Sequence, residues 1–359
     1  MSRKLLFFFD GTSRATAGFV NDAPTNMYRL NQVFTNGIAG EQISFYYAGV
    51  GTRDSKISKY TGRGFDQIVM EAYTNLASNY CPGDQIYLFG FSRGAVAARV
   101  LSGFLSNPGL LKEDRLSQDF PTAWRLYKNY ARDTLDWNER DRLRGKLHGS
   151  LHQATRVRFL GVFDSVPGYS HDIKLRVRNC VLEECVDHAV QILAADDRRT
   201  PFFAPLLWDD KKTPNQTLEQ IWLPGVHSDV GGSSDARFFG HLALLTMVER
   251  IQEHCPELEI EQGYVQHIEE EVFLDRPPIQ ITNECDTFEE KVLQWGRRHL
   301  QEHTMLHEVM GKLTGENIYI RRRRRTYRPR SGGNAQGVFT SKYTSQIDAA
   351  VEDNRKPAR

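Results

Sequence analysis

Ser92 is the residue whose surroundings most clearly suggest chemistry. It lies at the centre of the pentapeptide Gly90-Phe91-Ser92-Arg93-Gly94, between an apolar run at 85–89 and a helix-like run at 95–101. A strand, a G-x-S-x-G turn and a helix form a nucleophile elbow, in which a sharp turn presents the serine hydroxyl. The flanking glycines give the crowded turn room because they lack Cβ. The sequence predicts Ser92 as a nucleophile, with a purely structural turn as the alternative.

Two further residues complete the chemistry that such a serine needs. A serine hydroxyl is a poor nucleophile at neutral pH and requires a base, which in turn requires an orienting group. Asp164 closes an apolar run at 157–163, and His227 lies in a Gly-rich loop after the run at 220–223. Their order along the chain, serine then acid then histidine, is the one expected after this kind of turn. We therefore predict a Ser92–His227–Asp164 triad; a turn-forming aspartate and a surface-loop histidine are the alternatives.

Backbone amides are predicted to stabilise the oxyanion that forms during attack by serine. One donor is the N–H of Arg93, the residue after the nucleophile, and the other is that of Gly11 or Thr12, in the loop after an apolar run at 4–9. Asp10 is expected to hold that loop by hydrogen bonds. Asp229, two residues beyond His227 in the sequence, is expected to support the site.

Other polar residues offer weaker alternatives. His188 lies in a helix-like pattern and is expected to pack or to form hydrogen bonds, whereas His241 begins the helix after the His227 loop. A metal site formed by Asp10, Asp164 and Asp229 remains an alternative, but nothing in their spacing requires one. The expected chemistry needs neither a metal nor a cofactor.

The elements that would position these residues alternate between strands and helices. This alternation predicts an α/β fold, α/β-hydrolase-like, with a mainly parallel sheet and helices on both faces. The predicted strands cover 4–9, 43–48, 85–89, 157–163 and 220–223, and the predicted helices cover 26–34, 65–76, 95–101 and 242–251.

The domain organisation follows from where this pattern weakens. Residues 1–320 are expected to form one catalytic domain. A polar segment at about 107–150 resembles a helical insertion, with Trp124 on an amphipathic helix. Residues 198–215 form a candidate lid or acyl pocket, for which a buried loop is the alternative. Residues 321–359 are expected to form a basic, loosely ordered tail.

Composition limits the partners that the chain would attract. The 359 residues carry a formal net charge of +1, so no global field steers the protein to nucleic acid or to a membrane. Arg321–Arg325 form an unbroken basic run that could contact anionic lipid headgroups or nucleic-acid phosphates, or be merely solvated. Sparse cysteines favour a reducing compartment. The sequence contains no signal peptide or apolar membrane span, so a cytoplasmic protein is expected as synthesised.

Five ordered motifs together resemble one family. The set resembles the DUF2235 family, which includes the catalytic domain of Tle1-type type VI secretion phospholipase effectors. The match spans about residues 4–250. The motifs are Phe8-Phe9-Asp10-Gly11-Thr12, Tyr47-Ala48-Gly49-Val50-Gly51-Thr52, Gly90-Phe91-Ser92-Arg93-Gly94-Ala95, Gly161-Val162-Phe163-Asp164-Ser165-Val166 and Pro224-Gly225-Val226-His227-Ser228-Asp229-Val230-Gly231-Gly232.

The resemblance implies a function as well as a fold. It implies an α/β-hydrolase whose triad maps to Ser92, Asp164 and His227, and hydrolysis of glycerophospholipid esters of the phospholipase A type. It also implies export by a specialised secretion system and an immunity or regulatory partner. Two alternatives remain: an esterase for non-lipid substrates, and a non-catalytic binding or adaptor protein that uses the arginine run.

Overall fold

The computed structural model describes most of the chain. The described residues are 2–11, 24–35, 41–49, 65–132, 136–167, 181–199, 204–209, 213–234, 236–282, 296–329, 332–333, 335 and 337–356. Among them, no helix has both the length and the apolar character required to cross a bilayer.

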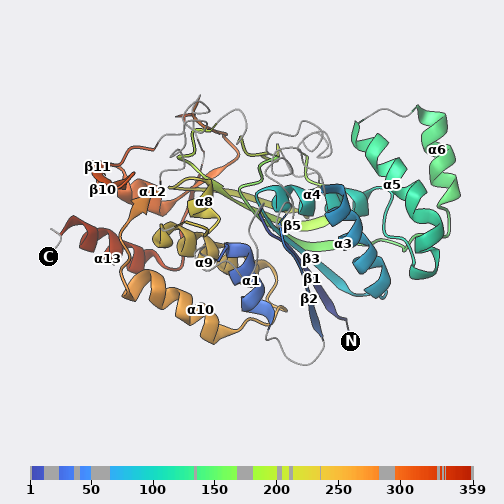
Figure 1. The fold of residues 1–359 in the computed structure, drawn as a ribbon, viewed down its shortest axis with the longest axis horizontal. Coiled ribbons are helices and arrows are strands. Elements are labelled where there is room, and N and C mark those ends of the chain that lie inside the picture. Colours follow the sequence, from blue (N-terminus) through green and yellow to red (C-terminus); the bar gives the residue numbers. More distant parts are fainter. Residues whose placement is uncertain are drawn as a thin grey trace.

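A parallel sheet of eight strands forms the centre of the molecule (Figure 1). Its order is β13-β9-β6-β5-β4-β3-β1-β2, and every neighbouring pair is parallel. The carboxyl ends of all eight strands therefore meet at one edge, where ligand sites of such sheets form. The strands are β1 (Lys4–Phe9), β2 (Gln42–Tyr47), β3 (Gln85–Phe91), β4 (Val157–Phe163), β5 (Val186–Ala194), β6 (Thr217–Leu223), β9 (Met305–His307) and β13 (Gly337–Phe339).

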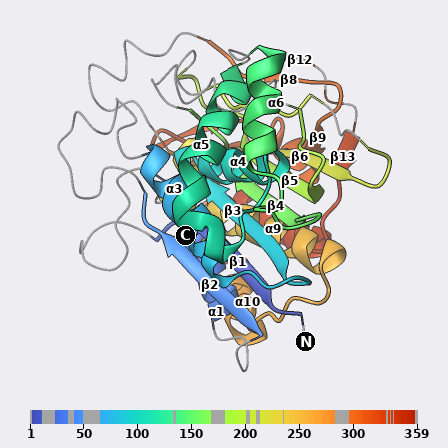
Figure 2. The ribbon, with the colours of Figure 1, turned by 90° about the vertical axis from the view of Figure 1, so that its right-hand side faces the viewer.

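Helices cover both faces of this sheet, which confirms the predicted α/β fold (Figures 1 and 2). Successive side chains of a strand point to opposite faces, so a strand covered on both sides must be apolar throughout. In β1, Leu6 and Phe8 enter one core, whereas Leu5, Phe7 and Phe9 enter the other. The first core packs against α1 (Asn26–Thr35), α9 (Arg237–His254), α10 (Gln262–Glu269), α12 (Glu308–Leu313) and α13 (Thr344–Arg355).

The second core is covered by helices from the middle of the chain. These are α3 (Phe65–Asn79), α4 (Arg93–Ser106), α5 (Leu116–Arg132) and α6 (Trp137–Lys146). The helices α5 and α6, with the short η1 (Glu113–Arg115), lie between α4 and β4. Trp124 of α5 packs on Phe104 of α4 with ring centroids 5.3 Å apart. This aromatic face attaches the segment between α4 and β4 to the sheet domain.

The remaining elements lie between α8 and the C-terminus. They are the short helix α8 (His227–Val230), the π-helical turn η2 (Glu270–Leu274), β7 (Gln280–Ile281), β8 (His299–Leu300), β10 (Asn317–Ile320), β11 (Arg323–Thr326) and β12 (Gly332–Gly333). β11, β10 and β7 form a small sheet, and β12 pairs with β8.

The residues beyond 320 differ from the expected loosely ordered tail. β13 pairs with β9 as an edge strand of the main sheet, and α13 buries Ile347 and Val351 in the first core. The pattern is hard to recognise because three residues of strand and two buried helix positions give almost no periodic signal.

His188 also differs from its expected helical setting, because it lies in β5. This strand is central, and residues 189–194 are apolar on both faces except for the buried Gln191, since both faces are covered. Periodicity alone cannot distinguish such a run from a buried helix.

One buried histidine makes stability sensitive to acid. His307 is fully buried, and its Nδ1 accepts a hydrogen bond from the N–H of Val309 at 3.2 Å, which caps α12. Burial, with a smaller effect from Lys312, lowers the pKa of His307 to about 3 from its usual 6.5. Below pH 6.5 the unfolded chain takes up a proton that the folded protein does not, so stability falls as the pH drops toward 3.

We predict that His307→Asn makes this acid destabilisation shallower by up to about 1.4 kcal/mol per pH unit. Asparagine can still cap α12 but does not titrate. Urea unfolding at several pH values between 7 and 4 measures the slope. The exposed His148→Asn serves as the control, and an equal slope in both variants would contradict the prediction.

Candidate active site

The turn after β3 holds Ser92 in a strained conformation. Its φ of 59° and ψ of −125° lie outside the regions that non-glycine residues favour. The turn is possible because a Cβ on Gly94 would lie 2.1 Å from the carbonyl oxygen of Phe9, and one on Gly90 would lie 2.5 Å from Cα of Ala95. The Ser92 N–H donates to the carbonyl of Phe163 at 3.0 Å, which ties the turn to the end of β4.

The structure brings the three predicted triad residues into one chain of hydrogen bonds. Ser92 Oγ and His227 Nε2 are 2.9 Å apart, and His227 Nδ1 lies 2.6 Å from Asp164 Oδ2. Asp164 follows β4, and His227 begins α8 after β6. The Phe91 ring stacks on the imidazole with centroids 4.8 Å apart and holds its plane. All three side chains are largely buried.

A fully buried arginine compensates the charge of Asp164. Arg298 donates from Nη1 to Asp164 Oδ1 at 2.5 Å and from Nη2 to Oδ2 at 2.9 Å. The Ala194 N–H adds a bond to Oδ1 at 3.2 Å. Burial alone would raise the pKa of Asp164, but the charge of Arg298 and the bonds from His227 outweigh it and keep this pKa below its usual value. The carboxylate is thus ionised and fixed in orientation.

A second buried pair lies beside the triad. Asp197 Oδ2 accepts from the backbone N–H of His227 at 3.2 Å and from Arg199 Nη2 at 2.6 Å. Burial opposes ionisation of Asp197, but Arg199 and, after it, Arg298 overcome this effect and lower its pKa. The backbone of the histidine and its side chain are therefore each held by a different buried carboxylate.

The small sheet fixes the His227 loop on both sides. Before the histidine, Asp196 Oδ2 accepts from the Gly225 N–H at 2.9 Å and from the Tyr327 hydroxyl at 3.0 Å. After it, Asp229 Oδ2 accepts from the N–H of Val226 at 3.0 Å and from that of Thr282 at 3.1 Å. Thr282 follows β7, and Tyr327 follows β11.

The loop after β1 lies beside the serine turn. Asp10 accepts hydrogen bonds from the Thr25 hydroxyl at 2.8 Å, from the Tyr46 hydroxyl and from the Gly11 N–H at 2.6 Å. The Gly11 amide is therefore already paired in this structure. Arg93 is the first residue of α4, where backbone N–H groups have no partner within the helix. Thr12 lies outside the described residues.

The three aspartates considered for a metal each have different partners. Asp10 holds the β1 loop, Asp164 pairs with Arg298, and Asp229 holds the α8 turn through Val226. Across the described residues, no cluster of His, Cys, Asp or Glu is arranged to bind a metal.

The described part of the candidate lid is buried at its centre and exposed at residues 204, 209, 214 and 215. Leu206, Leu207 and Trp208 pack in the two cores. The Arg99 guanidinium lies 4.0 Å from the Trp208 ring centroid. For these residues a buried loop is the appropriate description, whereas residues 200–203 and 210–212 lie outside the described residues.

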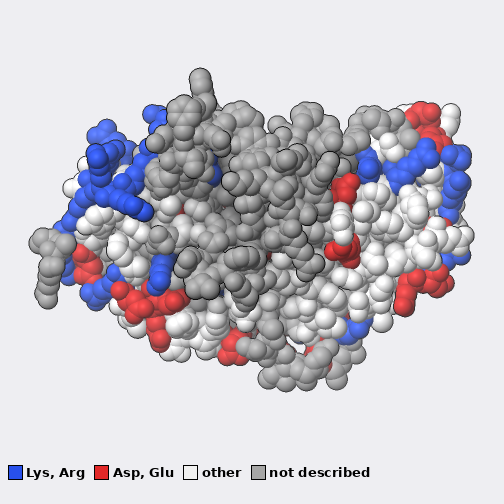
Figure 3. Space-filling model, in the orientation of Figure 1, with Lys and Arg blue, Asp and Glu red and all other residues white. Residues whose placement is uncertain are grey.

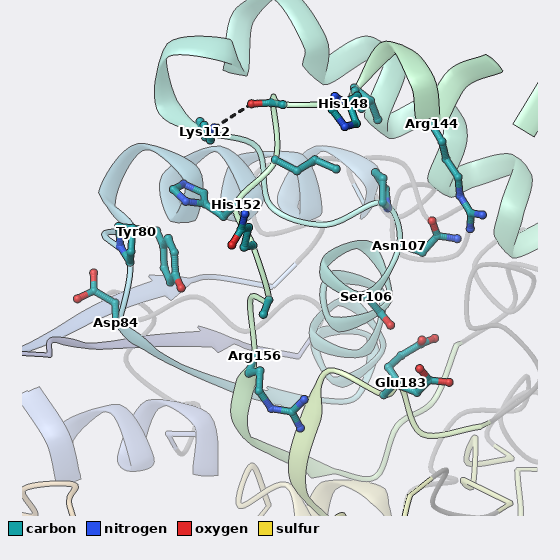
Figure 4. Close-up of a pocket in the computed structure, with 18 of the residues that line it drawn as sticks. Tyr80, Asp84, Ser106, Asn107, Lys112, Arg144, His148, His152, Arg156 and Glu183 are labelled. Carbon is teal, nitrogen blue, oxygen red and sulfur yellow. Dashed lines mark hydrogen bonds between the residues drawn. The ribbon is translucent and has the colours of Figure 1, made fainter. Parts of the chain in front are cut away.

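A groove of about 1200 Å³ lies at the opposite edge of the sheet (Figure 4). Its walls include Asp84, Arg156 and Glu183, which precede β3, β4 and β5 respectively. Asp84 is already paired with Arg3 at 2.6 Å. Because ligands of parallel sheets bind at the carboxyl edge, this groove is not the active site.

Several residues of the site lay outside the sequence prediction. Asp196 and Asp197 follow β5, in the same position as Asp164 after β4, but the helical interpretation of 187–190 concealed that strand end. Arg298 is 134 residues from Asp164 and lies in a segment without periodic signal. Only its contact with Asp164 identifies it.

A parallel α/β sheet with a serine on the elbow between β3 and α4 defines the α/β-hydrolase class. The family model for the T6SS phospholipase effector Tle1-like catalytic domain matches residues 3–250. The chain therefore belongs to this family.

Similarity to individual proteins is more distant. A Saccharomyces cerevisiae protein described as uncharacterized, YEL023C, is 28% identical over 222 residues, which cover 56% of this chain and 32% of that relative. The chain thus corresponds to only part of it.

Solved structures show weak overall likeness. An uncharacterized Pseudomonas aeruginosa protein has a TM-score of 0.49 at 15% identity, covering 76% of this chain and 48% of that one. A Tle1 effector bound to the VgrG spike has a TM-score of 0.35 at 23% identity, with coverages of 65% and 51%. The RedJ thioesterase of Streptomyces coelicolor has a TM-score of 0.31 at 16% identity, with coverages of 67% and 89%.

We predict that Arg298→Met lowers the free energy of unfolding by about 3–5 kcal/mol, because it leaves Asp164 buried without its counter-charge. The exposed neighbour Arg297→Met is the control and should stay within about 0.5 kcal/mol of the unsubstituted protein. In the double variant Asp164→Asn/Arg298→Met the costs should be strongly less than additive. Urea unfolding is measured for the unsubstituted protein, Arg298→Met, Asp164→Asn, the double variant and the Arg297→Met control, and additive costs would show that the pair is not coupled.

Proposed function

We propose that the protein is a serine hydrolase that cleaves carboxylic esters, with glycerophospholipids as substrates and phospholipase A-like products. The observation that carries the proposal is the continuous chain from Ser92 through His227 to Asp164, with contacts of 2.9 and 2.6 Å. Membership of a family of phospholipase effectors supports a lipid ester as the substrate.

In the proposed mechanism, Ser92 Oγ attacks the ester carbonyl while His227 Nε2 takes its proton. The C–O bond to the leaving alcohol then breaks, and His227 returns the proton to that alcohol, which leaves an acyl-enzyme. Water attacks the acyl group in a second cycle with the same base and releases the fatty acid. Throughout both cycles, Asp164 orients the imidazole and stabilises its charged form.

Backbone donors stabilise the oxyanion in this proposal. Arg93 N–H supplies one bond, and the β1 loop supplies the other, from Thr12 or from Gly11 once its N–H leaves Asp10 Oδ1. The support for this pairing is the packing of Gly94 against the carbonyls of Phe9 and Asp10, which places the β1 loop beside the elbow. Asp10 and Asp229 act as supports of the two loops.

The wider biological role is proposed from the family alone. Its description as a T6SS effector family supports export by a specialised secretion system, with an immunity or regulatory protein as a partner. Non-lipid esters are the alternative substrate class.

We expect a fluorophosphonate probe to label the protein and labelling to fall to background in Ser92→Ala and His227→Ala. Loss of either residue should lower kcat by on the order of 10⁶-fold, because the triad acts as a unit. Labelling is measured on gels with and without phospholipid vesicles, and Ser117→Ala, an exposed serine of α5, is the control.

Product analysis then separates the substrate classes. Release of fatty acid and lysophospholipid from vesicles supports the phospholipase. Turnover of soluble esters with intact vesicle lipid would assign a non-lipid esterase. Equal labelling of Ser92→Ala and the unsubstituted protein would reject the mechanism, and no labelling under any condition would favour a non-catalytic scaffold.

A further inference from the structure

The outer strand of the small sheet contributes charge rather than packing. All four residues of β11 are exposed, and three of them are arginines, Arg323, Arg324 and Arg325. The turn before the strand adds Arg321 and Arg322. Figure 3 shows basic side chains gathered at this end of the molecule, where Figure 1 labels β10 and β11. Four consecutive arginines, Arg322–Arg325, are therefore exposed, and the stability of the small sheet does not explain them.

The turn itself is demanding for arginine. Ile320 of β10 pairs with Arg323 of β11, so the hairpin turns on the two residues Arg321 and Arg322. Their φ values are 53° and 61°, in the left-handed region where asparagine and glycine are preferred. The chain thus has arginines at two positions where asparagine or glycine would adopt the backbone conformation at a lower cost. This cost suggests that the charge of the arginines has a function.

The carboxylates of the described residues do not neutralise most of the hairpin's exposed arginines. Arg324 donates to the backbone carbonyl of Asn354 at 2.6 Å rather than to a carboxylate. Among the described residues, no carboxylate lies within ion-pair distance of Arg322, Arg323 or Arg325. Exposed guanidinium groups of this kind bind phosphate oxygens through paired N–H donors.

The hairpin is attached rigidly to the catalytic edge. Tyr327 follows β11 and bonds through its hydroxyl to Asp196, which holds Gly225 ahead of His227. On the other side, β10 pairs with β7, and Thr282 after β7 bonds to Asp229. The arginines therefore have a fixed position relative to the His227 loop.

We propose that this arginine hairpin, residues 320–325, is a membrane-docking surface that seats the active-site edge on an anionic phospholipid bilayer. The proposal rests on the proposed function, since a phospholipase must bring its serine to a lipid surface. A bilayer is favoured over nucleic acid because the basic residues form a short projecting tip, whereas proteins that bind single strands follow the backbone along a charged groove.

The test uses the full chain with Ser92→Ala, so that vesicles are not consumed. Partitioning is measured by flotation with phosphatidylcholine vesicles and with vesicles in which a third of the lipid is phosphatidylglycerol. We expect binding only to the anionic vesicles, weakening as salt rises. Adding Arg323→Gln/Arg325→Gln should reduce partitioning by about thirtyfold, at about fivefold per charge.

A matched double variant removes the same charge elsewhere. Arg144→Gln/Lys146→Gln neutralises two exposed residues of α6, at the opposite end of the view in Figure 3, and should partition as the parent does. Equal partitioning of the hairpin variant and the parent, or equal binding of neutral and anionic vesicles, would overturn the proposal. So would binding to single-stranded DNA that is tighter than binding to vesicles and lost in the hairpin variant.

The experiments distinguish a wrong docking surface from a wrong hydrolase function. Labelling of Ser92 by a fluorophosphonate together with vesicle binding that ignores the hairpin substitutions would reject the docking surface alone. Absence of labelling with hairpin-dependent binding to anionic vesicles would reject the catalytic function alone.

Discussion

The ion pair between Arg298 and Asp164 is the interaction on which the site depends. A carboxylate without solvent exposure is costly to ionise, and a neutral Asp164 could not orient a charged imidazole. The arginine removes that cost with two hydrogen bonds, but it also competes with His227 for the same carboxylate. Asp164 therefore serves two positive partners, one permanent and one that would be charged only during the proposed reaction.

The architecture shows how a parallel sheet collects residues from distant parts of the chain. Ser92 follows β3, Asp164 follows β4, Asp197 follows β5 and His227 follows β6, so four adjacent strands deliver four polar side chains to one edge. The sheet sets their spacing, while the small sheet and the Asp196 and Asp229 carboxylates hold the last loop still. Precision at His227 thus comes from residues that take no direct part in the proposed chemistry.

The sequence predicted a structural feature or a candidate site residue wherever a local pattern of residues marked it. A serine between two glycines, and polar residues that end apolar runs, are visible in the order of residues, which is why the fold and the Ser92–His227–Asp164 set could be predicted. The contributions of Asp197 and Arg298 could not. The first follows a strand that resembles a helix because both its faces are buried, and the second acts through a contact across 134 residues that no local pattern encodes.

Arg298 lies outside the segment that the family model matches, so the site depends on more of the chain than that segment. The family match covers residues 3–250, which include Ser92, Asp164 and His227, whereas Arg298 lies beyond it. A chain cut before residue 298 would retain Ser92, Asp164 and His227 but would lack the guanidinium that offsets the buried charge of Asp164. The segment beyond the family match is thereby required for the charge balance of the proposed catalytic centre.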